Sequence, residues 1–167
     1  SEKTIVNVSG KKQGGVIRSL AKQSNTTSGN LNAASESGFG GKVDVTGDSV
    51  KVSSTTINAS GKLGGGKVRV GGEYLGGKLT NMDNNYKGFV TRFGDQPQLQ
   101  NAKQTIVTAD ANIDVSSQKG KGGTTVIWSD QVTEFDGQIN AKGAEKILVS
   151  ANLNQKPKFG ESTIDSP

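Results

Sequence analysis

Three acidic side chains, Asp130, Glu134 and Asp136, form the densest acidic group of the sequence. Two carboxylates that face one cleft can act as the acid and the base of glycan cleavage. Here all three lie within one strand-turn-strand run, and no Arg or His of catalytic use accompanies them. The chain contains no histidine and no cysteine, which excludes Ser-His-Asp and Cys-His catalysis and the common zinc motifs. The sequence therefore predicts a protein that is not an enzyme and has no catalytic residues.

A second polar cluster, Asp83, Asn84 and Asn85, offers oxygen ligands of the kind that calcium prefers. The spacing of a twelve-residue calcium loop is absent, and so are the nonapeptide repeats of calcium-binding β-rolls. Asn and Asp also favour turns by themselves. We therefore interpret the cluster as a turn and expect neither a metal site nor a cofactor.

Three N-glycosylation acceptor sequences begin at Asn7, Asn25 and Asn58. About two or three such sequences arise by chance in a chain this rich in Asn, Ser and Thr. The three asparagines remain candidate glycosylation sites.

The formal charge is +5, and most of the positive charge is carried by single lysines such as Lys42, Lys51, Lys62 and Lys67. A nucleic-acid interface would need clustered basic residues interleaved with aromatics, so no nucleic-acid partner is expected. Two interpretations stay open. The lysines either lie solvated on outward strand positions and protect sheet edges, or they meet an anionic partner such as an acidic glycan.

The elements that position these residues follow from a Gly-Gly phrase that recurs along the chain. Its second glycines, at 15, 41, 66 and 123, are separated by 26, 25 and 57 residues, and a degenerate copy places Glu145 22 residues further on. A period in the twenties is typical of a solenoid, and the long step fits one coil plus an insertion. Hydrophobic residues make up only 31% of the chain, but they are organised, which argues against disorder.

Within one coil, Val43 and Val45 alternate with polar residues, and residues 49–53 and 56–59 do the same. This is the period of half-buried strands, and frequent Gly and β-branched residues disfavour helices. Three strands and three turns in about 25 residues predict an all-β fold, a right-handed parallel β-helix. An Ile-Asn-Ala phrase recurs at Ile57 and Ile139. The residues predicted to point inward are Val43, Val45, Ile57, Val68, Val70, Ile127 and Ile139.

An insertion at about residues 76–100 breaks the period and is rich in aromatic residues. Loops that leave a rigid scaffold often carry binding residues. Alternatively, the aromatics form a small satellite core that ties the insertion to the rod. We expect Trp128 on the outside of the rod or at its corner, covering the base of the insertion. The candidate receptor-binding residues are Tyr74, Tyr86, Lys87, Phe89, Arg92 and Phe93.

Five phrases occur in order, at 71–77, 100–105, 111–116, 126–130 and 135–141. Over about residues 40–150 this succession resembles the exoproteins of bacterial two-partner secretion: filamentous haemagglutinin, the high-molecular-weight adhesins, and related haemolysins and contact-dependent inhibition proteins. The excursion between Gly77 and Gln100 is longer than in that family. The phrases resemble the family's long shaft rather than its amino-terminal secretion domain.

The resemblance implies a secreted β-helix at the surface of a Gram-negative bacterium, usually serving adhesion. It implies that an outer-membrane transporter engages the parent protein and not this segment. We expect residues 1–167 to be one monomeric slice of a longer exoprotein that contacts host-cell glycans or glycoproteins. The alternatives are a purely structural spacer and the stalk of a delivered toxin.

Overall fold

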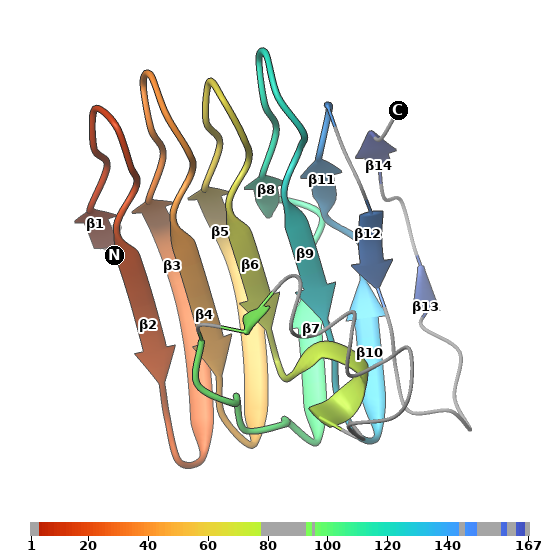
Figure 1. The fold of residues 1–167 in the computed structure, drawn as a ribbon. Helices are drawn as coiled ribbons and strands as arrows, with labels where there is room; N and C mark the ends of the chain where they lie inside the picture. The colour runs from red at the N-terminus through yellow and green to blue at the C-terminus, as the bar shows by residue number, and fades with distance from the viewer. Residues whose placement is uncertain are drawn as a thin grey trace.

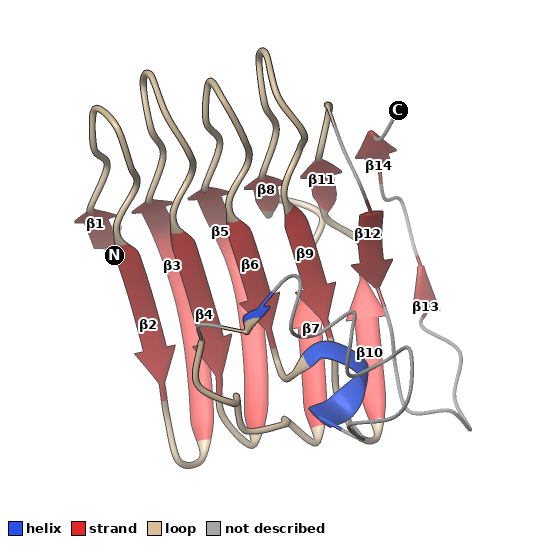
Figure 2. Cartoon of the chain, in the orientation of Figure 1, coloured by secondary structure: helices blue, strands red, loops and turns tan. Residues whose placement is uncertain are grey.

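The computed structural model describes residues 4–77, 93–94, 96–143, 146–149, 158–159 and 163–165, with side chains as far as residue 143. The described chain is almost entirely β-structure, and Figures 1 and 2 show its strands stacked side by side along one axis. Every pairing between the strands is parallel. No helix among the described residues is long and apolar enough to cross a membrane.

The strands form two sheets, which we call the front and back sheets as they lie in Figure 1. The front sheet has five strands: β2 (Val16–Leu20), β4 (Lys42–Thr46), β6 (Lys67–Val70), β9 (Thr124–Ile127) and β12 (Lys146–Val149). The back sheet has nine: β1 (Thr4–Asn7), β3 (Ser24–Asn32), β5 (Ser49–Asn58), β7 (Gln104–Val107), β8 (Asn112–Asp114), β10 (Val132–Phe135), β11 (Gln138–Asn140), β13 (Lys158–Phe159) and β14 (Thr163–Asp165).

The coils wind as a right-handed parallel β-helix, as predicted. In Figure 1 the chain descends through each front strand, ascends through the back sheet and then starts the next coil further to the right. The two halves of β5 pair separately with β7 and β8, so each coil holds three strand segments. In β3 and β5 the second and third segments are continuous across a bend.

The pairing register confirms the repeat alignment residue by residue. On the front sheet Ile17, Val43, Val68, Thr125 and Ile147 are successive partners. On the back sheet Leu31, Ile57, Ile113 and Ile139 align in the same way. All seven residues predicted to point inward belong to the main core cluster between the two sheets. Each coil therefore buries its few apolar residues against those of its neighbours.

A column of polar side chains explains the asparagine of the Ile-Asn-Ala phrase. Each side-chain oxygen accepts the backbone N–H two residues further on, at 2.8–3.2 Å, which is an Asx turn at the corner of the coil. The residues of this column are Asn7, Asn32, Asn58, Asp114 and Asn140.

The bend of β5 lies at Ser54, whose φ of 48° is unusual for a residue with a side chain. β5 has one residue more than β3 at this point. Asp110 of the next coil accepts both the N–H and the hydroxyl of Ser54, at 2.8 and 2.6 Å, and also the hydroxyl of Thr108. These hydrogen bonds hold the pKa of Asp110 well below its usual range.

Replacing the inward Val52 by Asp should lower the free energy of unfolding by on the order of 4 kcal/mol, because the new carboxylate would be buried without a partner. Lys51→Asp places the same side chain one residue earlier, on the exposed face, and should cost less than about 1 kcal/mol. Denaturant unfolding followed by circular dichroism measures both. Equal losses in the two variants would show that the register is wrong.

Asp110→Asn should destabilise the protein at neutral pH, because a neutral amide accepts the bonds from Ser54 more weakly. A carboxylate whose folded pKa is depressed stabilises the fold above its unfolded pKa of about 4 and loses that contribution as pH falls further. The difference in unfolding free energy between wild type and Asp110→Asn should therefore be constant above about pH 5 and shrink below about pH 4. A difference that does not change with pH would contradict this role of Asp110.

Candidate functional site: the anchored insertion on the front sheet

The insertion leaves the coil after β6 and rejoins it before β7. Its first described turn, a 3-10 segment over Tyr74–Gly77, lies over the outer face of the rod in Figure 2. The segment that rejoins the rod passes close to β6, where the Pro97 carbonyl accepts a hydrogen bond from Arg69 at 3.2 Å. The insertion thus covers part of the front sheet that would otherwise face solvent.

A fully buried charge network lies under this cover. Arg69 donates two hydrogen bonds of 2.8 Å to the carboxylate of Asp44 on the neighbouring strand. It also donates to both oxygens of Glu73, at 2.8 and 3.1 Å. The three side chains are between 0 and 1% exposed. The Asp44 pair is bidentate, through Nε and Nη2, whereas Nη1 alone reaches both oxygens of Glu73, so one guanidinium compensates two buried carboxylates.

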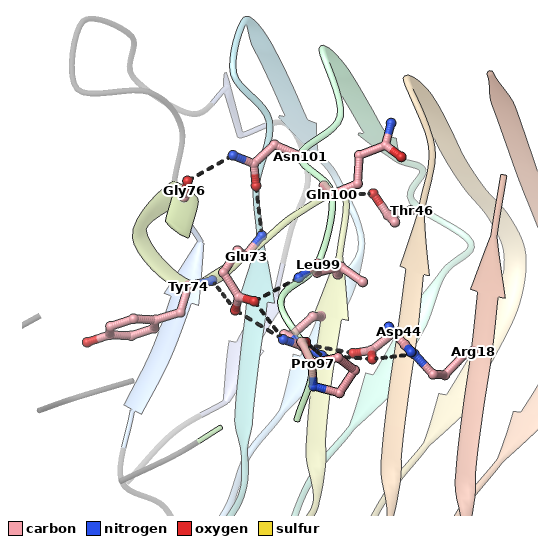
Figure 3. Close-up of polar contacts among 11 residues, drawn as sticks. Arg18, Asp44, Thr46, Glu73, Tyr74, Gly76, Pro97, Leu99, Gln100 and Asn101 are labelled. Carbon is pink, nitrogen blue, oxygen red and sulfur yellow. Dashed lines mark hydrogen bonds and ion pairs between the residues drawn. The ribbon is translucent and has the colours of Figure 1, made fainter. Parts of the chain in front are cut away.

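The network ties both ends of the insertion to the rod. The carboxylate of Glu73 accepts the backbone N–H of Tyr74 at 2.8 Å and that of Leu99 at 2.9 Å, as Figure 3 shows. Glu73 therefore joins the departing and the returning segments of the insertion to Arg69. Arg18, on the strand at the other side of β4, is partly exposed, and its Nε lies 3.3 Å from an Asp44 oxygen.

The charge state of Arg69 follows from these contacts. Burial lowers the pKa of the Arg69 guanidinium, but the hydrogen bonds and charges of Asp44, and then of Glu73, outweigh burial and raise that pKa above its usual value. Arg69 therefore stays charged. Its guanidinium carbon also lies 5.3 Å from the centre of the Phe93 ring, within the range of a cation–π contact.

A second set of hydrogen bonds, made by Asn101, holds the returning segment of the insertion. Asn101 accepts the N–H of Glu73 at 3.0 Å and donates to the Gly76 carbonyl at 2.9 Å. It also donates to Asp130 at 3.2 Å, and Asp130 accepts the indole N–H of Trp128 at 3.0 Å. Asp130, one of the three acidic residues considered above for catalysis, thus has a structural role.

Trp128 lies outside the main core, as predicted. Its side chain is 4% exposed and belongs to a separate cluster with Tyr74, Phe93 and Val126. A Cβ at Gly76 would lie 2.5 Å from its ring, and the φ of Gly76 is +68°, so glycine is needed on both counts. The indole therefore packs beneath the described ends of the insertion.

The predicted receptor residues separate into two groups. Tyr86, Lys87, Phe89 and Arg92 lie outside the described residues, as do Asp83, Asn84 and Asn85. Tyr74 and Phe93 are described, and their ring centres are 6.0 Å apart.

Phe93 is completely buried, so its ring cannot face a ligand. Tyr74 is 9% exposed, and its ring points away from the Glu73 contacts in Figure 3. Phe93 therefore belongs to the small satellite core that ties the insertion to the rod and is not a receptor-contact residue.

The three glycosylation candidates differ in accessibility. Asn7 is exposed and Asn58 is half-buried. Asn25 is buried, and its amide nitrogen donates to the carbonyls of Ser19 and Thr46, at 2.8 and 3.0 Å. The folded protein therefore cannot accept a glycan at Asn25.

Sequence reasoning missed Asp44, Arg69 and Glu73 as a unit. The repeat alignment did contain a signal, because Asp44 and Arg69 occupy the same position in consecutive copies and so face one another across the sheet. Charges at that outward position are ordinarily solvated. Only the cover provided by the insertion makes them a buried network. Among the described residues, no group of three or more potential ligands is placed to hold a metal ion.

The fold and the anchored insertion define a β-helical rod segment, and comparison with known proteins supports the same class. No protein-family model and no curated protein matches the chain. A solved structure, the HMW1 secretion domain from Haemophilus influenzae, is similar with a TM-score of 0.59 and 25% identity. The match covers 94% of this chain and 42% of that chain, so this protein spans less than half of its structural relative. The predicted resemblance to two-partner secretion exoproteins is confirmed.

Arg69→Met should lower the free energy of unfolding by about 3–5 kcal/mol, because Glu73 would remain as a buried carboxylate without a cation and Asp44 would keep only the partly exposed Arg18. Arg18→Met removes a partly exposed partner of the same carboxylate and should cost less than about 1 kcal/mol. Denaturant unfolding measures both losses, and Trp128 emission reports whether the insertion lifts from the rod. An Arg69→Met variant as stable as Arg18→Met would contradict the network's role.

Proposed function

We propose that the chain is a segment of a secreted exoprotein of a Gram-negative bacterium, exported by an outer-membrane two-partner transporter and presented at the cell surface. The similarity to the HMW1 secretion domain supports this origin. We infer that this segment is not an enzyme, because the chain has no histidine or cysteine and Asp130 accepts hydrogen bonds from Asn101 and Trp128.

We further propose that the segment acts in adhesion, with the insertion contacting glycans or glycoproteins of a host cell. The observation that carries this proposal is the buried Asp44–Arg69–Glu73 network, which holds both ends of the insertion to the front sheet. A plain spacer needs neither the insertion nor buried charges to anchor it. A rigidly anchored loop, by contrast, loses less conformational entropy when it binds.

The contact residues in this proposal are Tyr74 at the edge of the anchor, together with Tyr86, Lys87, Phe89 and Arg92. Aromatic faces fit the apolar side of sugar rings, and Arg can pair with a carboxylate or sulfate through two hydrogen bonds. An acidic glycan is the favoured ligand, because the chain has a net charge of +5.

A deletion that spares the anchor tests the proposal. Residues 79–91 are replaced by a short Gly-Ser turn, while Phe93, Pro97 and Leu99, which complete the anchor, are retained. Binding to host cells and to a glycan array should fall at least about tenfold, with unchanged unfolding free energy. A full-length variant with Tyr86→Ser, Phe89→Ser and Arg92→Gln should lose binding similarly. Lys22→Gln, in the short turn between β2 and β3 of the first coil, should not. Undiminished binding by the deletion variant would remove the insertion from the mechanism and favour the spacer.

A second candidate function is transporter recognition, because the similar solved structure is itself a secretion domain. It makes a different prediction for the same variants. Replacing residues 79–91, or removing Arg69, would then reduce the amount of parent protein exported, whereas an adhesion site would leave export unchanged. Immunoblotting of the culture medium distinguishes the two.

A further inference from the structure

One edge of the rod is built from stacked turns that join the back sheet to the front sheet. We call it the turn edge: residues 9–13, 35–39, 61–64, 117–121 and 141–143. Figure 1 shows these turns as loops side by side at the top of the rod. Two rows of parallel bridges keep them in register, one through Gly10, Ser35, Gly61 and Ser117, and one through Gln13, Phe39, Gly64 and Lys121.

The turns are fixed against one another rather than splayed. The N–H of Ser37 donates to the Lys11 carbonyl at 2.9 Å, and that of Lys119 donates to the Lys62 carbonyl at 2.8 Å. The Ser35 hydroxyl donates to the same Lys11 carbonyl at 3.0 Å. Successive coils lie about 4.8 Å apart, so five turns form a straight edge about 19 Å long.

The positive charge of the described residues is concentrated on this edge. It carries six lysines, Lys11, Lys12, Lys62, Lys119, Lys121 and Lys142, against one acidic residue, Glu36. The other described side chains comprise seven basic and eight acidic groups, which nearly cancel. Five of the six lysines are exposed, and Lys62 is half-buried.

Two large apolar side chains are exposed among these lysines. Phe39 is 52% exposed and Leu63 is 48% exposed, and they lie on adjacent turns. The other strongly exposed large hydrophobics, Ile5, Val16 and Leu20, all lie in the first described coil, at the end of the rod. The Phe39 ring lies over Gly64, where a Cβ would come within 2.6 Å of it. The packing against Gly64 therefore holds the Phe39 ring on the surface.

We propose that the turn edge binds a bilayer surface rich in anionic phospholipid headgroups. A straight row of lysines can meet the phosphates of one plane, and each lysine near such a surface contributes favourably. Exposed aromatic and aliphatic side chains among basic residues are typical of proteins that lie in the membrane interface. A soluble polyanion would need the lysines alone. The apolar pair therefore favours a lipid surface as the partner.

The proposal is independent of the insertion, whose described ends lie over the outer face of the front sheet. The rod would lie with its turn edge on the membrane and would leave the front sheet free. Variants of the turn edge and of residues 79–91 should therefore affect different measurements.

Cosedimentation of the chain with vesicles tests the proposal. Vesicles of phosphatidylcholine and phosphatidylglycerol in a two-to-one ratio should bind the chain, and pure phosphatidylcholine should bind it far more weakly. The combined variant Lys62→Gln, Lys119→Gln and Lys121→Gln should lose affinity by about fivefold for each lysine. A matched variant with Lys22→Gln, Lys51→Gln and Lys103→Gln removes the same charge from other faces and should lose much less.

The apolar pair is tested separately with Phe39→Ser and Leu63→Ser. This variant should bind the anionic vesicles on the order of tenfold more weakly, and the loss should persist at high salt, where lysine contacts are screened. Unchanged thermal unfolding in each variant shows that the fold is intact. Equal binding by the two triple-lysine variants would overturn the proposal. So would tight binding of dextran sulfate together with no effect of the Phe39 and Leu63 changes, which would identify a soluble polyanion as the partner.

Discussion

Parallel hydrogen bonding between successive coils is the constraint on which the whole structure depends. Because each front strand pairs residue for residue with the next, one inward position recurs as Ile17, Val43, Val68 and Thr125. Each coil is too poor in apolar residues to fold alone, so stability comes from the shared column. The same register stacks the Asn and Asp side chains at the corner of the coil and aligns the turns of the turn edge. Surface features therefore occur as rows along the rod.

The insertion leaves the register between neighbouring strands unchanged. β6 pairs directly with β9, although 53 residues lie between Val70 and Thr124. The register places Asp44 beside Arg69 on the outer face, and the insertion then buries both and adds Glu73 and the Pro97 carbonyl. Buried ion pairs contribute little net stability compared with apolar packing, but they are costly to break. In this rod the network specifies where the insertion is attached.

The repeat carried enough information to predict the coil, its three segments and its inward residues, because Val43 and Ile57 recur at a constant period. It also predicted that Trp128 lies outside the core, since its equivalents are Thr46 and Gly71. The burial of Phe93 and the charge network could not be predicted, because both depend on how a non-repeating segment folds over the sheet. Thr125 shows that the repeat predicts the position of a residue in the column but not whether its polar atoms find partners. It is a polar residue in the apolar column, and its hydroxyl has no hydrogen-bond partner.

Amide hydrogen exchange of the native protein tests most directly the claim that the insertion is anchored at both ends by Glu73. The N–H groups of Tyr74 and Leu99 both donate to that carboxylate and lie outside the regular strands. The account predicts that they exchange as slowly as the amides of β6 and that Glu73→Gln accelerates both while β4 stays protected. Rapid exchange of Tyr74 and Leu99 in the wild-type protein, at the rate of an unprotected loop, would contradict the account.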